Sequence, residues 1–330
     1  MRFRIFPITF FTIGAFIVPF FISKNTIQIT KFSQEINREK DNLKIELGKK
    51  LFFDKRLSIN NKVSCSTCHV PKYAFTDRKK VSEGVYGRKT ERNASSLLNC
   101  YKLKTVMFDA HLPSLEMQVI VPIQEHVEMD MKMIDLIKKI KQIHDYTMLA
   151  NKAFDREFDA FVLTRSIAAY ERTLRSEKSR FDAYYSGKNK HELTINEQKG
   201  WKLFSEKLYC IQCHPAPDFT TYLPENNGLE KECLTDKGRF RIHLDSTQIG
   251  FFKIPSLRNC DITFPYMHDG SLNTLEEVIN HYSMGGKGHP LQNKVIKPFK
   301  LTKEEKYQLI VFLKSLTDLS YLKNNKIHTK

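Results

Sequence analysis

The sequence predicts a mainly α-helical protein with two similar domains and long loops, and three observations support this fold class. Helical periodicity recurs along the chain, whereas the alternating pattern of strands is weak throughout. A short cysteine motif occurs twice, each time after a similar helical segment. The 330 residues, of which 41% are hydrophobic, suffice for two domains that each bury a core.

The N-terminus has the pattern of a targeting segment. Two of the first four residues are arginines, and an apolar run from Ile5 to Ile22 follows before the polar Ser23. A positive start followed by an apolar run is typical of an export signal, and this run is also just long enough for a membrane anchor. Residues 1–23 are therefore predicted to be a signal peptide or an N-terminal anchor, and either would place the rest of the chain outside the cytoplasm.

Two C-x-x-C-H motifs are the strongest signals in the sequence. They consist of Cys65, Cys68 and His69 in the first copy and of Cys210, Cys213 and His214 in the second. Thiols three residues apart on one helical turn can reach the two vinyl groups of one haem, and the adjacent histidine can bind the iron as proximal ligand. A redox dithiol or half a zinc site would leave both histidines unexplained. The motifs thus predict two covalently attached haem c groups, one in each of two cytochrome c-like domains.

The segments that precede the two motifs are also alike. A Gly-x-x-Leu-Phe pattern occupies residues 48–52 before the first motif and residues 200–204 before the second. Thr194 and Glu197 form a capping box, which predicts the start of the second of these helices. The polar, glycine-containing stretch at 186–190 predicts a boundary. We therefore expect an N-terminal domain over residues 40–186 and a C-terminal domain over residues 187–320.

Further helices are predicted from the spacing of apolar residues. One is indicated by five residues at helical spacing, namely Met133, Leu136, Ile137, Ile140 and His144. Others are expected over Asp159–Arg175, Thr274–His281 and Lys303–Leu316. The three cysteines outside the motifs, Cys100, Cys233 and Cys260, could be buried thiols, or one pair of them could form a disulfide.

The chain is basic, with 53 Lys and Arg against 37 Asp and Glu and a formal net charge of +16. The propionates of two haems would offset part of this charge. The basic residues are scattered and form no stripe interleaved with aromatic residues, which argues against nucleic-acid binding. A basic surface instead suits an acidic redox partner or an anionic membrane surface.

From about Leu47 to Leu316 the chain resembles the bacterial di-haem cytochrome c peroxidases and their MauG-type relatives. The segments that carry the resemblance are LGKKLFFDKRLS, CSTCH, AFTD, RNASSLLN, FDAHLPSLEMQ, PIQEHVEM, CIQCH, KIPSLRN and PYMHDGSLNTLEEV. The resemblance implies that hydrogen peroxide reacts at the N-terminal haem, and that electrons from a small cytochrome c or cupredoxin enter at the C-terminal haem. A MauG-type oxidase of a protein side chain and a non-enzymatic di-haem electron carrier are the alternatives, and a homodimer is one candidate assembly.

The resemblance also implies roles for individual residues. It makes His69 and His214 the proximal iron ligands, and it places Gln118 and Glu128 in the distal pocket over the N-terminal haem. Reduction of peroxide requires that a proton move from one oxygen to the other, and a carboxylate over the iron can move it as general base and then acid. Glu128 suits that task, whereas Gln118 could orient peroxide by hydrogen bonding.

A calcium site between the domains is a further implication of the resemblance. The matching residues are Asn93, Thr263 and Pro265. Calcium binds six to eight oxygen atoms, often including water. One side-chain amide and two backbone carbonyls would therefore form a sparse site that water completes.

Three departures from the family pattern bear on function. Many of these peroxidases hold a loop histidine on the N-terminal haem until reduction releases it, and the matching loop here would lie roughly between Val81 and Arg88. This chain has no histidine between His69 and His111. The sixth position of that iron is therefore predicted to be open or filled by water. Phe108 stands where the family has a tryptophan between the haems, and His111 stands where it has arginine. Phenylalanine is harder to oxidise than tryptophan, so electron hopping through Phe108 is in question.

The third departure concerns the distal ligand of the C-terminal haem. Tyr282 stands where classical members have a methionine ligand, fourteen residues after His268, and MauG-type members have tyrosine there. Met267 and Met284 lie in the same segment and are the alternative ligands. We expect Tyr282 to be the ligand, which favours a MauG-like C-terminal haem.

Overall fold

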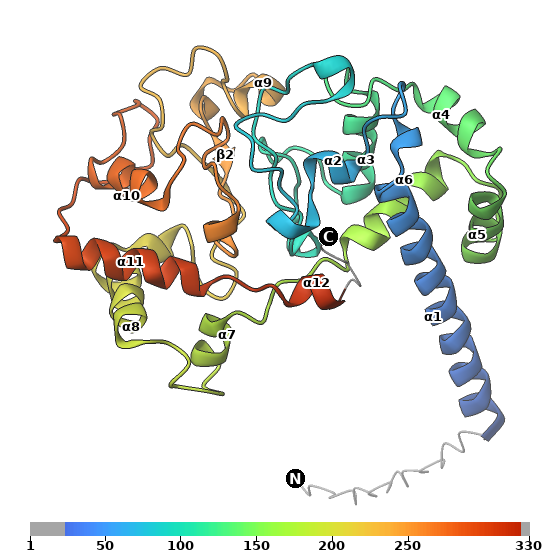
Figure 1. Ribbon diagram of the computed structural model, residues 1–330, viewed down its shortest axis with the longest axis horizontal. Coiled ribbons are helices and arrows are strands. Elements are labelled where there is room, and N and C mark those ends of the chain that lie inside the picture. Colours follow the sequence, from blue (N-terminus) through green and yellow to red (C-terminus); the bar gives the residue numbers. More distant parts are fainter. Residues whose placement is uncertain (1–23, 325–330) are drawn as a thin grey trace, which may run out of the picture. The chain divides into compact units, whose positions relative to one another are not determined.

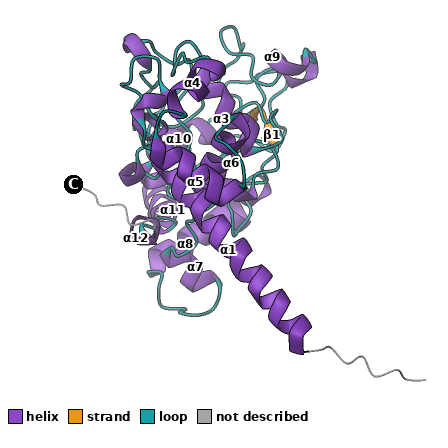
Figure 2. Cartoon of the chain, turned by 90° about the vertical axis from the view of Figure 1, so that its right-hand side faces the viewer, coloured by secondary structure: helices purple, strands orange, loops and turns teal. Residues whose placement is uncertain are grey.

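The computed structural model describes residues 24–324, and most of its regular structure is helical (Figures 1 and 2). The mainly α fold class predicted from the sequence is therefore confirmed. The predicted signal or anchor at residues 1–23 lies outside the described residues. Within residues 24–324, no helix combines the length and the apolar character that crossing a membrane would require.

The α-helices are, in chain order, α1 (Lys24–Phe52), α2 (Cys65–Cys68), α3 (Leu115–Gln124), α4 (Met133–Ile140), α5 (His144–Phe154), α6 (Ala160–Glu171), α7 (Arg180–Tyr185), α8 (Ile195–Lys202), α9 (Phe240–His243), α10 (Leu275–Ser283), α11 (Lys303–Ser315) and α12 (Ser320–Asn324). Strand β1 (Pro224–Glu225) pairs antiparallel with strand β2 (Phe252–Lys253). Residue contacts divide the chain at Glu39, and both C-x-x-C-H motifs lie in the unit Lys40–Lys330.

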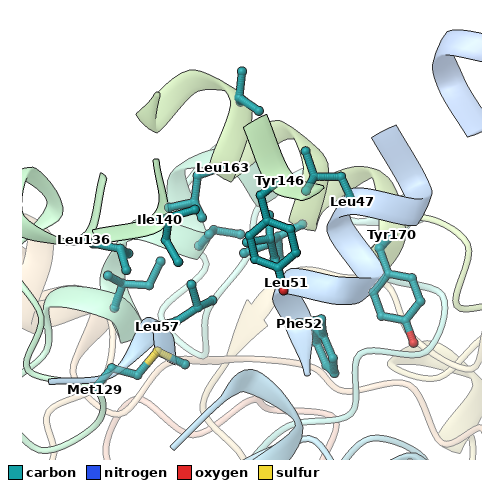
Figure 3. Packing of buried hydrophobic residues seen from close by; sticks show 14 of the residues in the cluster. Leu47, Leu51, Phe52, Leu57, Met129, Leu136, Ile140, Tyr146, Leu163 and Tyr170 are labelled. Carbon is teal, nitrogen blue, oxygen red and sulfur yellow. The ribbon is translucent and has the colours of Figure 1, made fainter. Parts of the chain in front are cut away.

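The first hydrophobic core forms where α1 packs against α6. Figure 3 shows Leu51 and Phe52 of α1 among the buried residues of this core, together with Leu163 and Tyr170 of α6. The ring centroids of Phe52 and Tyr170 are 5.2 Å apart in an edge-to-face arrangement, a favourable geometry for two aromatic rings. The apolar residues of the first Gly-x-x-Leu-Phe pattern thus anchor the N-terminal core.

The glycines of the two repeated patterns make equivalent close contacts. A Cβ atom on Gly48 would lie 1.8 Å from the Ser166 carbonyl oxygen on α6, and a Cβ atom on Gly200 would lie 2.0 Å from the Gln308 carbonyl oxygen on α11. Each glycine therefore lets one helix approach the backbone of another. Figure 1 shows α8 and α11 side by side. The close helix contact that each glycine allows is the structural reason for the repeated pattern.

The second hydrophobic core is rich in aromatic residues. Phe204, Phe219 and Phe312 pack against one another, with ring centroids 5.2–6.1 Å apart, and Phe181 of α7 joins them. The first core contains residues up to Leu174 and also Tyr321 near the C-terminus. The chain thus changes core before the polar stretch at 186–190, and the division into residues 40–186 and 187–320 stays a prediction.

Several predicted helices begin at a side chain that caps them. Asp159 caps α6, Thr194 caps α8, Thr274 caps α10 and Thr302 caps α11, each by accepting a hydrogen bond from a backbone N–H in the first turn. The helix predicted to run through His144 is wrong at its C-terminal end, because α4 ends at Ile140 and His144 begins α5. Ile143 adopts an extended conformation between the two helices and packs on the first core.

The cysteines outside the motifs form no disulfide in the structure. Cys100 and Cys260 are buried, and Cys233 is partly buried. The Cys100 thiol donates a hydrogen bond to the Glu171 carbonyl, with a sulfur–oxygen distance of 3.3 Å. The structure therefore supports the thiol alternative.

Candidate functional site

The first C-x-x-C-H motif folds as a short helical turn. Cys65 and Cys68 delimit α2, and the His69 N–H donates a hydrogen bond to the Cys65 carbonyl at 2.9 Å. Before the turn, the Ser64 N–H donates to the Thr67 hydroxyl at 3.0 Å, which fixes the entry of the chain. This turn presents two thiols and one imidazole close together, as attachment of a single haem requires.

The two motif histidines have the same ring environment. Nδ1 of His69 lies 2.9 Å from the Phe75 carbonyl oxygen, and Nδ1 of His214 lies 2.9 Å from the Phe219 carbonyl oxygen. Because a carbonyl only accepts hydrogen bonds, Nδ1 carries the proton in each ring and Nε2 keeps a lone pair for a metal. Burial lowers the pKa of His69 and lowers the pKa of His214 to about 4. Both rings are therefore neutral at pH 7 and suited to iron ligation.

The motif thiols fit thioether bonds better than thiolate chemistry. Burial raises the pKa of Cys68 to about 11 and the pKa of Cys210 to about 12. Neutral thiols are poor zinc ligands and poor redox pairs, because both tasks require the thiolate. Residues 24–324 also contain no group of three or more Cys, His, Asp or Glu that could hold a metal ion. The donor set thus fits covalent haem.

One cavity next to the first motif brings the predicted distal residues together. Besides Cys65, Cys68 and His69, it is lined by Gln118 of α3 and by Glu128. The apolar part of its lining consists of Val63, Val119, Pro122, Met129 and Ile167. Haem is a flat, largely apolar ring, so this lining of two thiols, an imidazole, apolar side chains and a few polar groups has the chemistry that a haem site requires.

Glu128 lies in the loop after α3, and backbone hydrogen bonds hold it there. Its N–H donates to the Glu125 carbonyl at 3.0 Å, and its carbonyl accepts from the Val85 N–H at 2.8 Å. Burial raises the pKa of Glu128 to about 7, and the nearby Glu125 charge raises it in the same direction. A carboxyl group with a pKa near neutrality can both accept and release a proton at physiological pH.

Glu171 is a residue of this cavity that sequence analysis missed. It is 4% exposed at the end of α6 and lines the cavity with Gln118 and Glu128. Its Oε2 atom has no hydrogen-bond partner among the described residues, and burial raises its pKa to about 8. In the sequence Glu171 stands beside Arg172 and looks like half of an exposed ion pair. Arg172 instead pairs with Glu116 at 2.8 Å, which leaves Glu171 facing inward.

The loop between Val81 and Arg88 does not supply a residue to the cavity lining. Val85 is fully buried in the first core, whereas Tyr86 at the tip of the loop is 63% exposed. His69 is the only histidine among the described residues that lines the cavity. His111 lies elsewhere, and burial lowers its pKa. That the sixth position of the N-terminal iron is open or filled by water stays a prediction.

Phe108 lies outside the cavity, at the junction of the two halves of the chain. Its carbonyl accepts a hydrogen bond from the Lys253 N–H at 2.7 Å. Arg92 donates to both carboxylate oxygens of the adjacent Asp109 at 2.9 Å and also pairs with Asp236. These bonds connect the segment of Phe108 to residues of the C-terminal half of the chain, and the inter-haem role of Phe108 stays a prediction.

Tyr282 of α10 lies close to the cysteines of the second C-x-x-C-H motif. Burial raises the pKa of Tyr282 to about 12, and Cys213 and Cys210 are among the groups that act on its phenol. The Met267 sulfur accepts a hydrogen bond from Asn227 at 3.3 Å. Met284 is 67% exposed, which argues against a place in the haem pocket. The structure thus leaves Tyr282 and Met267 as candidate ligands.

The predicted calcium residues make hydrogen bonds with the protein. The Asn93 side chain donates to the Lys79 carbonyl at 2.7 Å, and the Asn93 N–H donates to the His268 carbonyl at 2.8 Å. The peptide bond between Phe264 and Pro265 is cis, and Thr263 directly precedes Phe264. Because Nδ2 of Asn93 is used as a donor, its Oδ1 is the atom that could face a cation.

Comparison with known proteins identifies the family. Residues 42–190 match the protein-family model of the di-haem cytochrome c peroxidases. The methylamine utilization protein MauG of Methylorubrum extorquens is 34% identical over 275 residues, which cover 83% of this chain and 78% of that protein. The cytochrome c551 peroxidase of Nitrosomonas europaea is 31% identical over 276 residues, which cover 82% of this chain and 79% of that protein.

A solved structure agrees with these relatives. The crystal structure of a MauG-like protein associated with microbial copper homeostasis matches with a TM-score of 0.79 at 34% sequence identity, covering 85% of this chain and 91% of that one. The fold, the paired motifs and the relatives all lead to the same assignment. The chain therefore belongs to the di-haem cytochrome c peroxidase family, whose members carry two covalently attached haem c groups.

Proposed function

We propose that the protein reduces hydrogen peroxide to water at the N-terminal haem, with electrons that a small cytochrome c or a cupredoxin delivers one at a time to the C-terminal haem. The observation that carries this proposal is the cavity in which His69, Gln118 and Glu128 meet beside the haem-attaching thiols. Each peroxide takes up two electrons and two protons and yields two water molecules. The bound haems supply the iron that binds peroxide and the route by which electrons arrive.

Glu128 is the group that moves the proton. As a carboxylate it accepts a proton from one peroxide oxygen, and as the acid it returns that proton to the other oxygen, which leaves as water. The pKa of Glu128, which burial raises to about 7, allows both steps at neutral pH. Gln118 donates an amide N–H to peroxide and orients it, while the apolar walls of Val119 and Met129 limit competing water.

The oxidised protein is ready to bind peroxide without prior activation. The absence of a histidine between residues 69 and 111, and the burial of Val85 in the core, support this part of the proposal. An EPR spectrum of the fully oxidised protein should contain a high-spin ferric signal from the N-terminal haem. A spectrum with two fully low-spin haems would contradict it and would mean that a side chain such as His111 reaches the iron.

Peroxide-dependent oxidation of a reduced small cytochrome c tests the enzymatic proposal against a non-enzymatic carrier. The peroxidase should oxidise two cytochromes for each peroxide consumed. An electron carrier would exchange electrons with the cytochrome but would leave the peroxide concentration unchanged. Repetition with a reduced cupredoxin identifies the class of donor, and the basic surface of the chain favours an acidic one.

A MauG-type oxidase is the second candidate function. The observation that favours it is Tyr282 near the second motif, in the position where MauG-type members have tyrosine. Such an enzyme would use peroxide to oxidise a side chain of a partner protein. Mass spectrometry of a co-expressed partner, before and after treatment with peroxide and this protein, should then reveal a quinone-type modification that the Glu128→Gln variant does not produce.

The bacterial periplasm is the location that fits these roles, with the N-terminus either cleaved or retained as an anchor. Covalent haem attachment takes place outside the cytoplasm, and the charged and apolar start of the chain fits export.

The proposed calcium ion would bind at Asn93, Thr263 and Pro265. Treatment with a chelator should lower peroxide turnover, and added calcium should restore it. Turnover that is unaffected by chelation, with no calcium in the purified protein, would exclude this ion.

A further inference from the structure

A second cavity lies where the two halves of the chain meet. It has a volume of about 670 Å³ and shares no lining residue with the cavity of the first motif. Its walls come from the segment 102–110 of the N-terminal half and from the segment 218–224 of the C-terminal half, together with Arg239. The cavity is therefore separate from the proposed peroxide site.

Two lysines line this cavity, and only one of them has a partner in the protein. The Lys102 ammonium pairs with Asp218 at 2.5 Å and with Glu177 at 3.0 Å, so its charge is compensated. Lys104 is exposed and forms no hydrogen bond or ion pair with the residues that the structure describes. Lys104 thus leaves one positive charge open to an incoming group.

Arg239 adds a second positive charge to the cavity. Its Nη1 atom donates to the Asp109 carbonyl at 2.9 Å and to the Ala110 carbonyl at 2.7 Å, and its Nε atom donates to the Gln248 side chain at 2.5 Å. None of these acceptors carries a full charge, and within residues 24–324 the guanidinium pairs with no carboxylate. The bonds therefore fix the position of Arg239 without cancelling its charge.

An exposed apolar side chain lies among these charges. Leu223 is 59% exposed and lines the cavity next to Pro224. The Leu223 carbonyl accepts a hydrogen bond from the Ile254 N–H at 2.9 Å, which holds this part of the loop in place. Brief electron-transfer complexes have small interfaces, and complementary charges steer the partners together. An exposed leucine beside two uncompensated cations has the composition of such a docking site for an acidic protein.

The loop that forms the cavity wall also contacts the second C-x-x-C-H motif. The N–H of Thr221, which lines the cavity, donates to the Cys213 carbonyl at 3.0 Å. Two residues earlier, the Phe219 carbonyl accepts the hydrogen bond from Nδ1 of His214. A protein docked at the cavity would therefore lie against the loop that contacts both a haem-attaching cysteine and the predicted iron ligand.

We propose that this cavity is the docking site of the electron donor, and that the donor is an acidic redox protein whose carboxylates pair with Lys104 and Arg239. This inference rests on the proposed function, in which electrons enter at the C-terminal haem. Each encounter transfers one electron from the reduced metal centre of the donor to the oxidised C-terminal haem, and no bond forms or breaks. A small anion would need the two cations but not the exposed Leu223, so the apolar contact favours a protein.

Rapid mixing of the oxidised di-haem protein with a reduced redox protein, without peroxide, tests the inference. The two probes are an acidic cupredoxin of the plastocyanin type and a basic cytochrome c of the mitochondrial type. At low salt the acidic probe should have the larger second-order rate constant. That rate constant should fall as salt is added, because exposed charges are screened beyond about 10 Å at 0.1 M ionic strength. A basic probe that reacts faster would exclude an acidic donor.

Substitutions in the cavity locate the docking site. Lys104→Glu should lower the rate constant of the acidic probe by about tenfold at low salt and by less at high salt. Leu223→Ala should lower it at every salt concentration, because salt does not screen an apolar contact.

Lys188→Glu is the matched control. It makes the same change in net charge at an exposed lysine of the polar stretch 186–190, which does not line the cavity. Its rate constant should change by less than about twofold. The content of covalent haem, measured for every variant, shows whether each one folds and matures.

Two further results would overturn the inference, and they are distinguishable. If Lys104→Glu and Lys188→Glu lower the rate constant equally, only the net charge of the chain matters and the donor docks elsewhere, while the proposed function stands. If neither probe reduces the wild-type protein, the proposed classes of donor fail, and the docking site fails with them.

Discussion

The N–H of Val85 donates a hydrogen bond to the carbonyl of Glu128 at 2.8 Å. This bond joins the loop between Val81 and Arg88 to the segment of the proposed proton-transfer residue. This loop contains no histidine, and it buttresses the backbone of Glu128. Gly84 makes the contact possible, because a Cβ atom there would lie 2.1 Å from the Val127 carbonyl oxygen.

Gly84→Ala should lower peroxide turnover without loss of haem. The added methyl group has no space against Val127 and Glu128 and must displace one of the two segments. A shift of about 1 Å in a catalytic group can cost about 10² in rate. Gly87→Ala is the control in the same loop, because a Cβ there meets nothing within 4 Å. Gly87→Ala should lower the stability somewhat, because residue 87 has a positive φ, but it should leave peroxide turnover intact. Equal turnover in the Gly84→Ala and Gly87→Ala variants would contradict the buttressing role of the loop.

Glu128→Gln should reduce peroxide turnover by about 10²- to 10⁴-fold, the usual range for general acid–base catalysis. The substitution keeps the size of the side chain but removes the proton-transfer group. Steady-state rates at saturating donor measure the loss. Glu125→Gln removes an exposed carboxylate three residues earlier and should retain the maximal rate. A loss below about threefold in Glu128→Gln would assign the proton transfer to another group.

Peroxide reactivity should rise with pH through a midpoint near 7. Burial raises the pKa of Glu128 to about 7, and the carboxylate is the form that accepts the first proton. Below that pH the group is protonated and cannot act as the base, whereas above it the base is available. Glu125→Gln should move the midpoint to lower pH, because the Glu125 charge also raises this pKa. A midpoint that does not move in Glu125→Gln, or that persists in Glu128→Gln, would show that another group controls the rate.

Glu171→Gln should stabilise the protein at neutral and alkaline pH. Burial raises the pKa of Glu171 to about 8, above the ordinary value of 4.5 that holds in the unfolded chain. Between these values the folded protein keeps a proton that the unfolded chain releases, so stability falls as pH rises, by about 1.4 kcal/mol per pH unit. Glutamine has no proton to lose. Thermal unfolding of the haem-containing protein should show the gain at pH 8 and no gain at pH 4.

Glu116→Gln is the control for that measurement. Burial opposes ionisation of Glu116, but Arg172 lowers its pKa below the ordinary value. Its loss should therefore destabilise the protein slightly at pH 8, the opposite sign to Glu171→Gln. The opposite result would be a wild-type protein that becomes more stable than Glu171→Gln as the pH rises. That result would contradict the conclusion that Glu171 is buried and holds a proton in the folded protein.

The features predictable from the sequence are those encoded by local spacing. The two C-x-x-C-H motifs and the cap at Thr194 depend on residues a few positions apart, and in the structure both motifs begin a helical turn and Thr194 caps α8. The helix expected to run through His144 shows the limit of this approach. The residues keep helical spacing up to His144, but α4 ends at Ile140 and the backbone is extended at Ile143. Periodicity alone does not reveal where a helix stops without proline or glycine.

Long-range contacts could not be predicted from this sequence. Gly48 and Gly200 were visible as a repeated pattern, but their contacts with α6 and α11 emerge only when the helices pack. Glu171 stands beside Arg172 in the sequence, but Arg172 pairs with Glu116, which lies 55 residues before Glu171 and is not linked to it by any local pattern. Asn227 contacts Met267 across forty residues, and no local pattern signals that bond.

Rapid mixing of the fully oxidised protein with hydrogen peroxide tests most directly whether the N-terminal haem is open and reactive. The haem absorption should change without a lag, at a rate proportional to the peroxide concentration, and the Glu128→Gln variant should react about 10²- to 10⁴-fold more slowly. No change until a donor has reduced the C-terminal haem would contradict this claim, because the N-terminal iron would then be closed by an internal ligand in the oxidised protein.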